Sequence, residues 1–195
     1  MLDTRYSMLD TRQACGSEQR FDALTAPSEV EGQASKILVL GLGNILLKDE
    51  GIGVHIAQQL QSKLLPYNVE VIDGGTASLD VFLLTQGIDK VVVVDALRAG
   101  NKAGTIYRAQ LNLEECDKLE QIFSNEGKIS LHQMGLIDAL AAVRKMDCAP
   151  KEVVIIGVEP ESVDLGLELT DRVKRKVPEI IDTVLKEIED AVYRK

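Results

Sequence analysis

Short apolar runs alternate along the chain with segments in which apolar residues recur at helical spacing. Four continuous apolar runs have the length and the β-branched content of strands that are buried on both faces. A fifth run alternates between apolar and polar positions, which is typical of a half-exposed strand. The four buried strands are expected at 36–41, 69–73, 90–95 and 152–157, and the half-exposed strand at 104–110.

The segments between these runs favour helices. In 51–65 apolar residues recur every four positions, and Pro66 follows. The segment 170–193 is expected to begin with Thr170 as its cap and to kink at Pro178. Strands that alternate with helices indicate an α/β fold with a mostly parallel sheet, whose ligand sites lie beyond the carboxyl ends of the strands. Three further helices are expected over 78–86, 113–123 and 135–146.

The first 35 residues differ from the rest of the chain. They contain few aliphatic residues, and the pentapeptide Met-Leu-Asp-Thr-Arg occurs at 1–5 and again at 8–12. Such a segment cannot bury enough apolar surface to offset the entropy of ordering it. We therefore expect residues 1–35 to form a disordered extension, or a translated repeat upstream of the true start, and residues 36–195 to form one domain.

Charge and cysteine usage exclude several classes of protein. The 195 residues include 22 basic and 31 acidic ones, for a net charge of −9, which argues against nucleic acid or an anionic membrane as a partner. No apolar run approaches the roughly 18 residues of a membrane span, and no signal peptide is visible. Cys15, Cys116 and Cys148 form no C-x-x-C motif, so we expect reduced thiols in a cytoplasmic protein, with a monomer as the default.

Residues capable of chemistry follow the predicted strands. Glu50 lies at the head of the first helix, Asp73 and Asp95 end the second and third strands, and His132 precedes the helix predicted at 135–146. These four residues map to one edge of the predicted sheet. Three carboxylates and one imidazole suit a first-row divalent metal, and a carboxylate cluster could also exchange protons or activate water.

Each of these residues also has a purely structural explanation. Glu50 could be an acid favoured by the dipole of a helix N-terminus, and Asp95 could accept backbone hydrogen bonds at a strand end. Asp73, which precedes two glycines, could form an Asx turn, and His132 could be a cap. His55 lies inside the first predicted helix and is assigned no chemistry.

A dinucleotide-binding site is the competing interpretation. Gly41 and Gly43 follow the first strand, but Leu46 stands where the third glycine of G-x-G-x-x-G belongs. The glycines at 41, 43, 51 and 53 are explained more simply by turns with positive φ and by close backbone approach. No P-loop, G-x-S-x-G or H-E-x-x-H motif is present. A non-enzymatic, Rossmann-like protein that binds a nucleotide or a partner therefore stays open as the alternative.

Five blocks of sequence, in order and with matching spacing, resemble the hydrogenase maturation proteases. The resemblance covers residues 36 to about 192 and excludes the first 35 residues. Ser78 departs from it, because family members often carry glycine at that position. The blocks are Ile37–Val54, Asp73–Thr76, Val94–Ala96, Ser130–Gly135 and Gly157–Glu161.

The resemblance implies a three-layer sandwich of the phosphorylase/hydrolase-like type and an endopeptidase activity. The implied substrate is the nickel-loaded precursor of a [NiFe] hydrogenase large subunit, from which a C-terminal extension is removed. Glu50, Asp95 and His132 would contact the nickel that the substrate supplies and are candidate catalytic groups, with Asp73 as a secondary one. No other cofactor-binding residue is expected. Metal-assisted and aspartic-type hydrolysis both stay open, as does action on other protein substrates.

Overall fold

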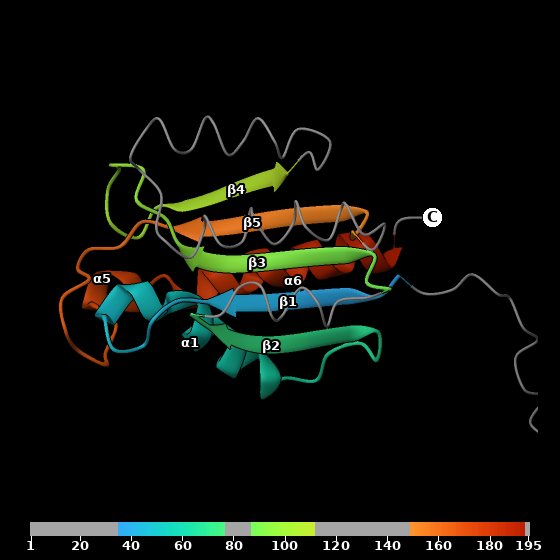
Figure 1. The fold of residues 1–195 in the computed structure, drawn as a ribbon, viewed down its shortest axis with the longest axis horizontal. Coiled ribbons are helices and arrows are strands. Elements are labelled where there is room, and N and C mark those ends of the chain that lie inside the picture. Colours follow the sequence, from blue (N-terminus) through green and yellow to red (C-terminus); the bar gives the residue numbers. More distant parts are fainter. Residues whose placement is uncertain (1–34, 77–86, 112–148, 194–195) are drawn as a thin grey trace, which may run out of the picture. The chain divides into compact units, whose positions relative to one another are not determined.

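The computed structural model describes residues 35–76, 87–111 and 149–193. Within these ranges the chain forms a five-stranded sheet in the order β2-β1-β3-β5-β4 (Figure 1). Neighbouring strands are parallel except for β4, which runs antiparallel to β5. All five predicted strands are confirmed, with ends that shift by one or two residues. The strands are β1 (Ile37–Leu42), β2 (Val69–Gly75), β3 (Lys90–Ala96), β4 (Ile106–Leu111) and β5 (Glu152–Val158).

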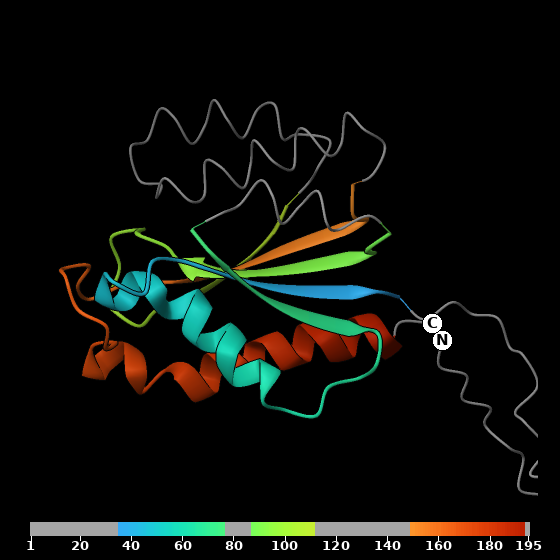
Figure 2. The same ribbon diagram turned by 60° about the horizontal axis from the view of Figure 1, so that its bottom comes forward.

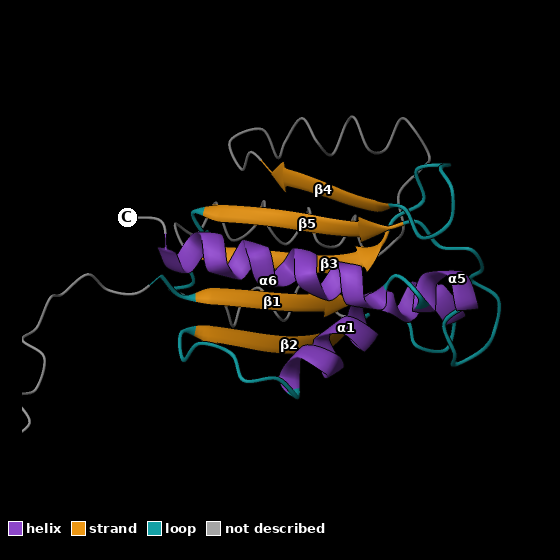
Figure 3. Cartoon of the chain, turned by 180° about the vertical axis from the view of Figure 1, so that it is seen from behind, coloured by secondary structure: helices purple, strands orange, loops and turns teal. Residues whose placement is uncertain are grey.

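The described helices cover one face of the sheet, as Figures 2 and 3 show. Strand residues alternate between the two faces, so Ile37 and Val39 belong to the apolar cluster that α1 and α6 complete, whereas Leu38 and Leu40 belong to a second cluster. Both clusters are buried, as expected of a sheet that is covered on both faces in a three-layer sandwich. The helical elements are the 3-10 turn η1 (Lys48–Gly51), α1 (Ile52–Gln61), α5 (Asp171–Lys174) and α6 (Val177–Tyr193).

The structure corrects two helix predictions. The helix predicted to run to residue 65 ends at Gln61, where the Ser62 hydroxyl donates to the carbonyl of Gln59, and Leu64 is fully exposed instead of packed. The C-terminal segment begins with Thr170 as its cap, as predicted. The segment does not kink at Pro178 as predicted but is interrupted before it, between α5 and α6. Pro178 lies in the first turn of α6, where a missing N–H is tolerated.

Several predictions fall outside the described residues. These are the disordered extension, the helices at 78–86, 113–123 and 135–146, and the state of the three cysteines. Among the residues that the structure describes, no helix is both long enough and apolar enough to span a bilayer.

The strand order creates a switch point between β1 and β3. The chain passes from β1 to its neighbour β2, and then to β3 on the other side of β1. Connections that leave neighbouring parallel strands in opposite directions open a crevice at their carboxyl ends, where α/β proteins bind ligands. Asp95 is the second-to-last residue of β3, and η1 follows β1. The topology therefore places Asp95 and the Glu50 segment at the two sides of this crevice.

Candidate functional site

Two glycines let α1 begin directly against the strand ends. A Cβ atom on Gly53 would lie 2.1 Å from the carbonyl oxygen of Val94 and 2.3 Å from that of Leu42. Gly43 has a φ of +133°, and a Cβ atom there would lie 1.8 Å from the carbonyl oxygen of Glu50. Only residues without side chains allow these approaches. Close approach is thus confirmed as the role of these glycines, while a positive φ occurs only at Gly43 among the four glycines considered above.

Glu50 and Asp95 occupy different environments at the switch point. Asp95 is fully buried, and its Oδ1 accepts a hydrogen bond from the backbone N–H of Ala96 at 2.8 Å. Glu50 is partly exposed on η1, which contacts β3. The two carboxylates lie on elements in contact and differ in hydration, and such carboxylates can divide the tasks of binding a cation and exchanging a proton.

The neighbouring Asp49 fixes the segment that carries Glu50. Its carboxylate is fully buried and accepts hydrogen bonds from four donors. Oδ2 accepts from the backbone N–H groups of Glu161 at 2.9 Å and Ser162 at 3.0 Å, and from the Thr170 hydroxyl at 2.9 Å. Oδ1 accepts from the N–H of Thr170 at 2.7 Å. Asp49 therefore ties η1 to the loop between β5 and α5.

Glu159 performs a similar task for the loop after β3. Its buried carboxylate accepts from the N–H groups of Ala99 at 2.9 Å, Gly100 at 3.2 Å and Asn101 at 3.3 Å, and from the Tyr107 hydroxyl at 2.5 Å. Burial alone would raise the pKa of Glu159, but these four hydrogen bonds outweigh it and lower the pKa. Burial and the bond to Glu159 raise the pKa of Tyr107. Near neutral pH the pair is thus a carboxylate and a neutral phenol.

Asp73 forms an Asx turn, which was one of the two roles expected for it from the sequence. Its Oδ1 accepts from the N–H of Gly75 at 3.0 Å, and its Oδ2 accepts from the Gln58 side chain at 3.1 Å. Gly75 in turn accepts a hydrogen bond from the N–H of Gly43 at 2.8 Å. The side chain is exposed, and its hydrogen bonds shape the end of β2 and connect it to α1, while the backbone bond between Gly43 and Gly75 connects the ends of β1 and β2.

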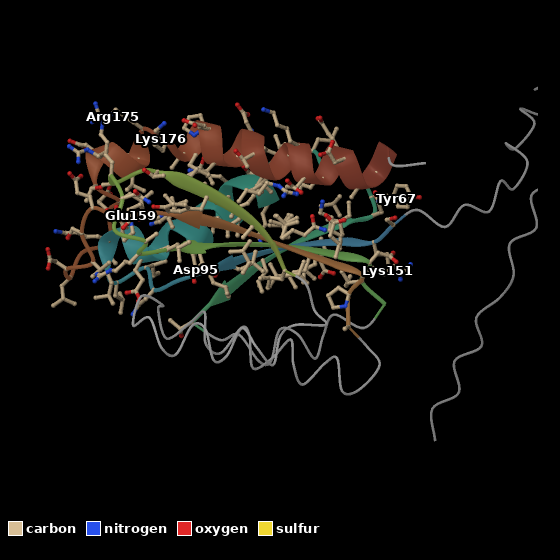
Figure 4. All side chains as sticks on the ribbon, turned by 90° about the horizontal axis from the view of Figure 1, so that it is seen from above. Tyr67, Asp95, Lys151, Glu159, Arg175 and Lys176 are labelled. Carbon is tan, nitrogen blue, oxygen red and sulfur yellow. The ribbon has the colours of Figure 1, made fainter. Side chains whose placement is uncertain are left out.

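An open cavity of about 470 Å³ lies between the loops that follow β3 and β5. Its lining includes Arg98 and Gly100 from the first loop and residues 159–164 from the second. Figure 4 shows Asp95 and Glu159 at the same end of the sheet. A substrate segment in this cavity would lie beside the end of the strand that carries Asp95.

The structure assembles part of the predicted set. Glu50 and Asp95 lie on elements that meet, whereas His132 is outside the described residues. In ranges 35–76, 87–111 and 149–193, no three His, Cys, Asp or Glu side chains form a metal-binding group. Asp49 and Glu159 could not be recognised from the sequence, because their partners are mostly backbone N–H groups, which no sequence pattern reveals.

Fold and site together define an α/β protein with an acidic site at the switch point of a mostly parallel sheet. A family model described as hydrogenase maturation protease matches residues 54–187. The Hydrogenase 2 maturation protease of Escherichia coli K12 is 36% identical over 158 residues, which are 80% of this chain and 92% of that protein. The hydrogenase expression/formation protein HupD of Bradyrhizobium diazoefficiens is 35% identical over 77% of this chain and 76% of its own.

Solved structures agree with these relatives. The hydrogenase maturating endopeptidase HybD from Escherichia coli superposes with a TM-score of 0.70 at 36% identity, covering 80% of this chain and 93% of that one. The [NiFe] hydrogenase maturation protease HybD from Thermococcus kodakarensis superposes with a TM-score of 0.60 at 30% identity, covering 78% and 98%. The chain belongs to the hydrogenase maturation protease family and is an endopeptidase of that family. The predicted family, fold class and enzyme class are confirmed.

Proposed function

We propose that this endopeptidase removes the C-terminal extension from the nickel-loaded precursor of a [NiFe] hydrogenase large subunit. The observation that carries the proposal is the contact at the switch point between η1, which carries Glu50 and is fixed by Asp49, and β3, which carries Asp95. A partly exposed carboxylate and a buried one on these two elements provide hard oxygen ligands at an edge where a protein chain can enter. Relatives described as maturation proteases support the same activity.

Glu50, Asp95 and His132 are the proposed contacts to the nickel. Two carboxylates and an imidazole suit a first-row divalent ion, which belongs here to the substrate. An ion in that place would polarise a nearby carbonyl. In this proposal Glu50, the more accessible carboxylate, accepts a proton from the water that attacks the scissile carbonyl and delivers it to the amine that leaves when the C–N bond breaks. In the aspartic-type alternative the carboxylates alone activate the water. Asp73 acts through the turn that it forms.

The rim of the site suits a protein substrate. Four aliphatic side chains are between 41% and 83% exposed on two loops beside η1. The loops are joined by backbone hydrogen bonds from Gly166 N to Leu46 O at 2.9 Å and from Lys48 N to Gly166 O at 2.7 Å. Exposed aliphatic residues on a fixed backbone are typical of surfaces that bind proteins. They are Ile45, Leu46, Leu165 and Leu167.

The same rim weakens the nucleotide-binding alternative. Leu46, which replaces the third glycine of the dinucleotide motif, is more than half exposed on the loop before η1. A binding site for pyrophosphate needs backbone N–H groups that are open at this place. Here the Leu46 N–H donates instead to the side chain of Asn44 at 3.0 Å. We therefore propose a protein substrate and no nucleotide, and place the enzyme in the cytoplasm, where reduced cysteines are ordinary.

Intact-mass analysis of a precursor large subunit tests the function. The enzyme should release one C-terminal peptide from the nickel-loaded precursor and none from the metal-free form. Glu50→Ala and His132→Ala should each abolish the release without changing the circular dichroism. Glu70→Ala, at an exposed position of β2, is the matched control and should process normally. Full processing by the Glu50 and His132 variants would refute the assignment of these residues.

A further inference from the structure

A second open groove, of about 520 Å³, lies between the loop before β4 and the junction of α5 and α6. One wall is the loop 102–106, and the other is formed by residues of the two helices. Four of the lining side chains are cationic and one is acidic, in a protein whose net charge is −9. We call this the basic groove. Its cations are Lys102, Arg172, Arg175 and Lys176, and its acid is Glu179.

Among the residues that the structure describes, two of the groove's cations have no carboxylate partner. Arg172 lies 3.3 Å from Glu161, and Lys176 lies 2.5 Å from Glu179. Arg175 donates to the carbonyl of Asp171 at 3.1 Å, and within the described part of the chain neither it nor Lys102 forms an ion pair. Both side chains are exposed. The groove therefore presents positive charge that an anionic partner could neutralise. The same charge would repel a cationic partner.

Several cations outside the groove are paired with carboxylates. Lys48 lies 3.8 Å from Asp164, and Lys151 lies 2.7 Å from Asp89. Arg108 is bonded to Glu187. Exposed cations without an ion pair also occur elsewhere in the described residues, at Lys36, Lys63, Arg98 and Lys186. What distinguishes the basic groove is that four cations line one surface.

The basic groove is connected to the candidate site through Glu159. The N–H of Gly104 donates to the Glu159 carbonyl at 2.8 Å, and the Glu159 N–H donates to the carbonyl of Thr105 at 2.9 Å. The carboxylate of the same residue holds the loop after β3. A Cβ atom on Gly104 would lie 3.1 Å from Lys176 Cγ, so the two walls are in close contact. Figure 4 shows Arg175 and Lys176 at the same end of the molecule as Asp95 and Glu159.

From this placement we propose that the basic groove docks an acidic segment of the precursor large subunit while another part of the precursor occupies the cleavage site. The inference rests on the proposed function and deepens it, since it names a second contact with the same substrate. The carboxylates of an acidic segment would match the groove, because in the described ranges two of its cations form no ion pair and the partners of the other two are exposed. Such a contact speeds and orients the encounter without entering the chemistry. It should act on KM and not on kcat.

Charge reversal at the two unpaired cations tests the proposal. In the double variant Lys102→Glu/Arg175→Glu, the KM for the nickel-loaded precursor should rise about tenfold at low salt while kcat stays unchanged. For the wild type kcat/KM should fall as salt is added, and for the variant this dependence should flatten or reverse. The matched control Lys63→Glu/Lys151→Glu carries the same change in charge at exposed positions outside the groove. Lys151 lies at the opposite end of the sheet (Figure 4).

Direct binding separates this inference from the proposed function. Fluorescence anisotropy with labelled poly-L-glutamate should show salt-sensitive binding to the wild type and to the control, and at least tenfold weaker binding to the groove variant. Equal KM values in both double variants would overturn the docking role while normal cleavage upheld the protease function. A wild type that cleaves no precursor would overturn the function and with it this use of the groove. Binding to phosphatidylserine vesicles but not to poly-L-glutamate would overturn the choice of a protein partner.

Discussion

The two ends of the sheet bury charge in opposite ways. At the amino end, Lys90 Nζ lies 2.8 Å from Glu187 Oε2 and 3.3 Å from Glu152 Oε1, and Arg108 also binds Glu187. Charges of opposite sign neutralise one another there. At the carboxyl end, Asp49 and Glu159 are bound by backbone N–H groups and hydroxyls, which are neutral donors. These hydrogen bonds stabilise the two carboxylates without neutralising them.

This difference separates a structural end from a functional end. Burial alone would raise the pKa of Glu187, but the bonds and charges of Arg108 and Lys90 lower it. The pKa of Glu159 is lowered by hydrogen bonds alone. An ion-pair network leaves little field outside itself, whereas carboxylates held by neutral donors leave a negative potential that attracts a cation. The carboxyl end is therefore the end at which the proposed contact with a metal-loaded substrate would be favourable.

The largest effect on stability is expected at the amino end. Lys90→Met leaves the buried Glu187 and the half-buried Glu152 with one cation fewer, so the free energy of unfolding should fall by about 3–5 kcal/mol. Urea unfolding measures the change. Lys151→Met, which removes an exposed ion pair with Asp89, is the control and should cost less than about 1 kcal/mol. Processing by folded Lys90→Met should match the wild type, and a loss of kcat there would contradict the division between the two ends.

Asp49→Asn should give the second-largest loss of stability and a loss of activity. In the variant the NH₂ group of the amide must face N–H or O–H donors that a carboxylate oxygen accepts from in the wild type. We therefore expect the free energy of unfolding to fall by about 3 kcal/mol. The folded variant should process the precursor at least tenfold more slowly. Denaturant unfolding and the intact-mass assay measure the two effects. Thr170→Val is the milder control, because it removes one donor and a helix cap, at a cost of about 1 kcal/mol. If folded Asp49→Asn processed at the wild-type rate, Asp49 would have no part in placing Glu50.

The sheet could be predicted from sequence because each strand carries its own signal. The run at 90–95 contains four consecutive valines, and the run at 36–41 ends in Gly41, against which α1 packs closely. The end of α1 could not be predicted, because Leu64 continues the helical spacing although the chain has already left the sheet. The spacing of apolar residues shows which helix positions could pack against the sheet. The tertiary structure determines where the helix ends.

Some residues of the candidate site could likewise be predicted from the sequence, and others could not. Glu50 and Asp95 could be placed because strand ends in a parallel sheet share one edge. Asp49 could not be separated from its neighbour, since the donors that bind it lie more than 110 residues further along the chain. Glu159 follows a strand like many surface acids, and its partners are three backbone N–H groups and Tyr107. Hydrogen bonds to the backbone depend on the fold and not on the identity of the partner residue.

Glu159→Gln tests whether neutral donors stabilise a true anion. Because the folded-state pKa of Glu159 lies below the ordinary value of 4.5, its charge stabilises the folded state above that pH. This contribution is lost as the pH falls through the lowered pKa. The variant should cost about 1–2 kcal/mol at neutral pH, and the difference from the wild type should shrink in acid.

Urea unfolding of both proteins across the acid range gives this difference directly. Subtracting the two curves isolates Glu159 from Glu187, whose pKa is also lowered. Tyr107→Phe removes one of the four donors and should cost less than Glu159→Gln. A difference that grows in acid would show that the folded structure favours the protonated form of Glu159.

The smallest effect is expected for Asp73→Asn. Asparagine keeps an oxygen that can accept from the Gly75 N–H, and the bond to Gln58 is exposed, so stability should change by less than about 0.5 kcal/mol. If Asp73 acts only through its turn, processing should stay within about twofold of the wild type. Asp73→Ala, which cannot form the turn, should be the more harmful of the two. If instead Asp73→Asn were folded but inactive, the negative charge itself would be needed. Asp73 would then have a direct role in the reaction and not only a structural one.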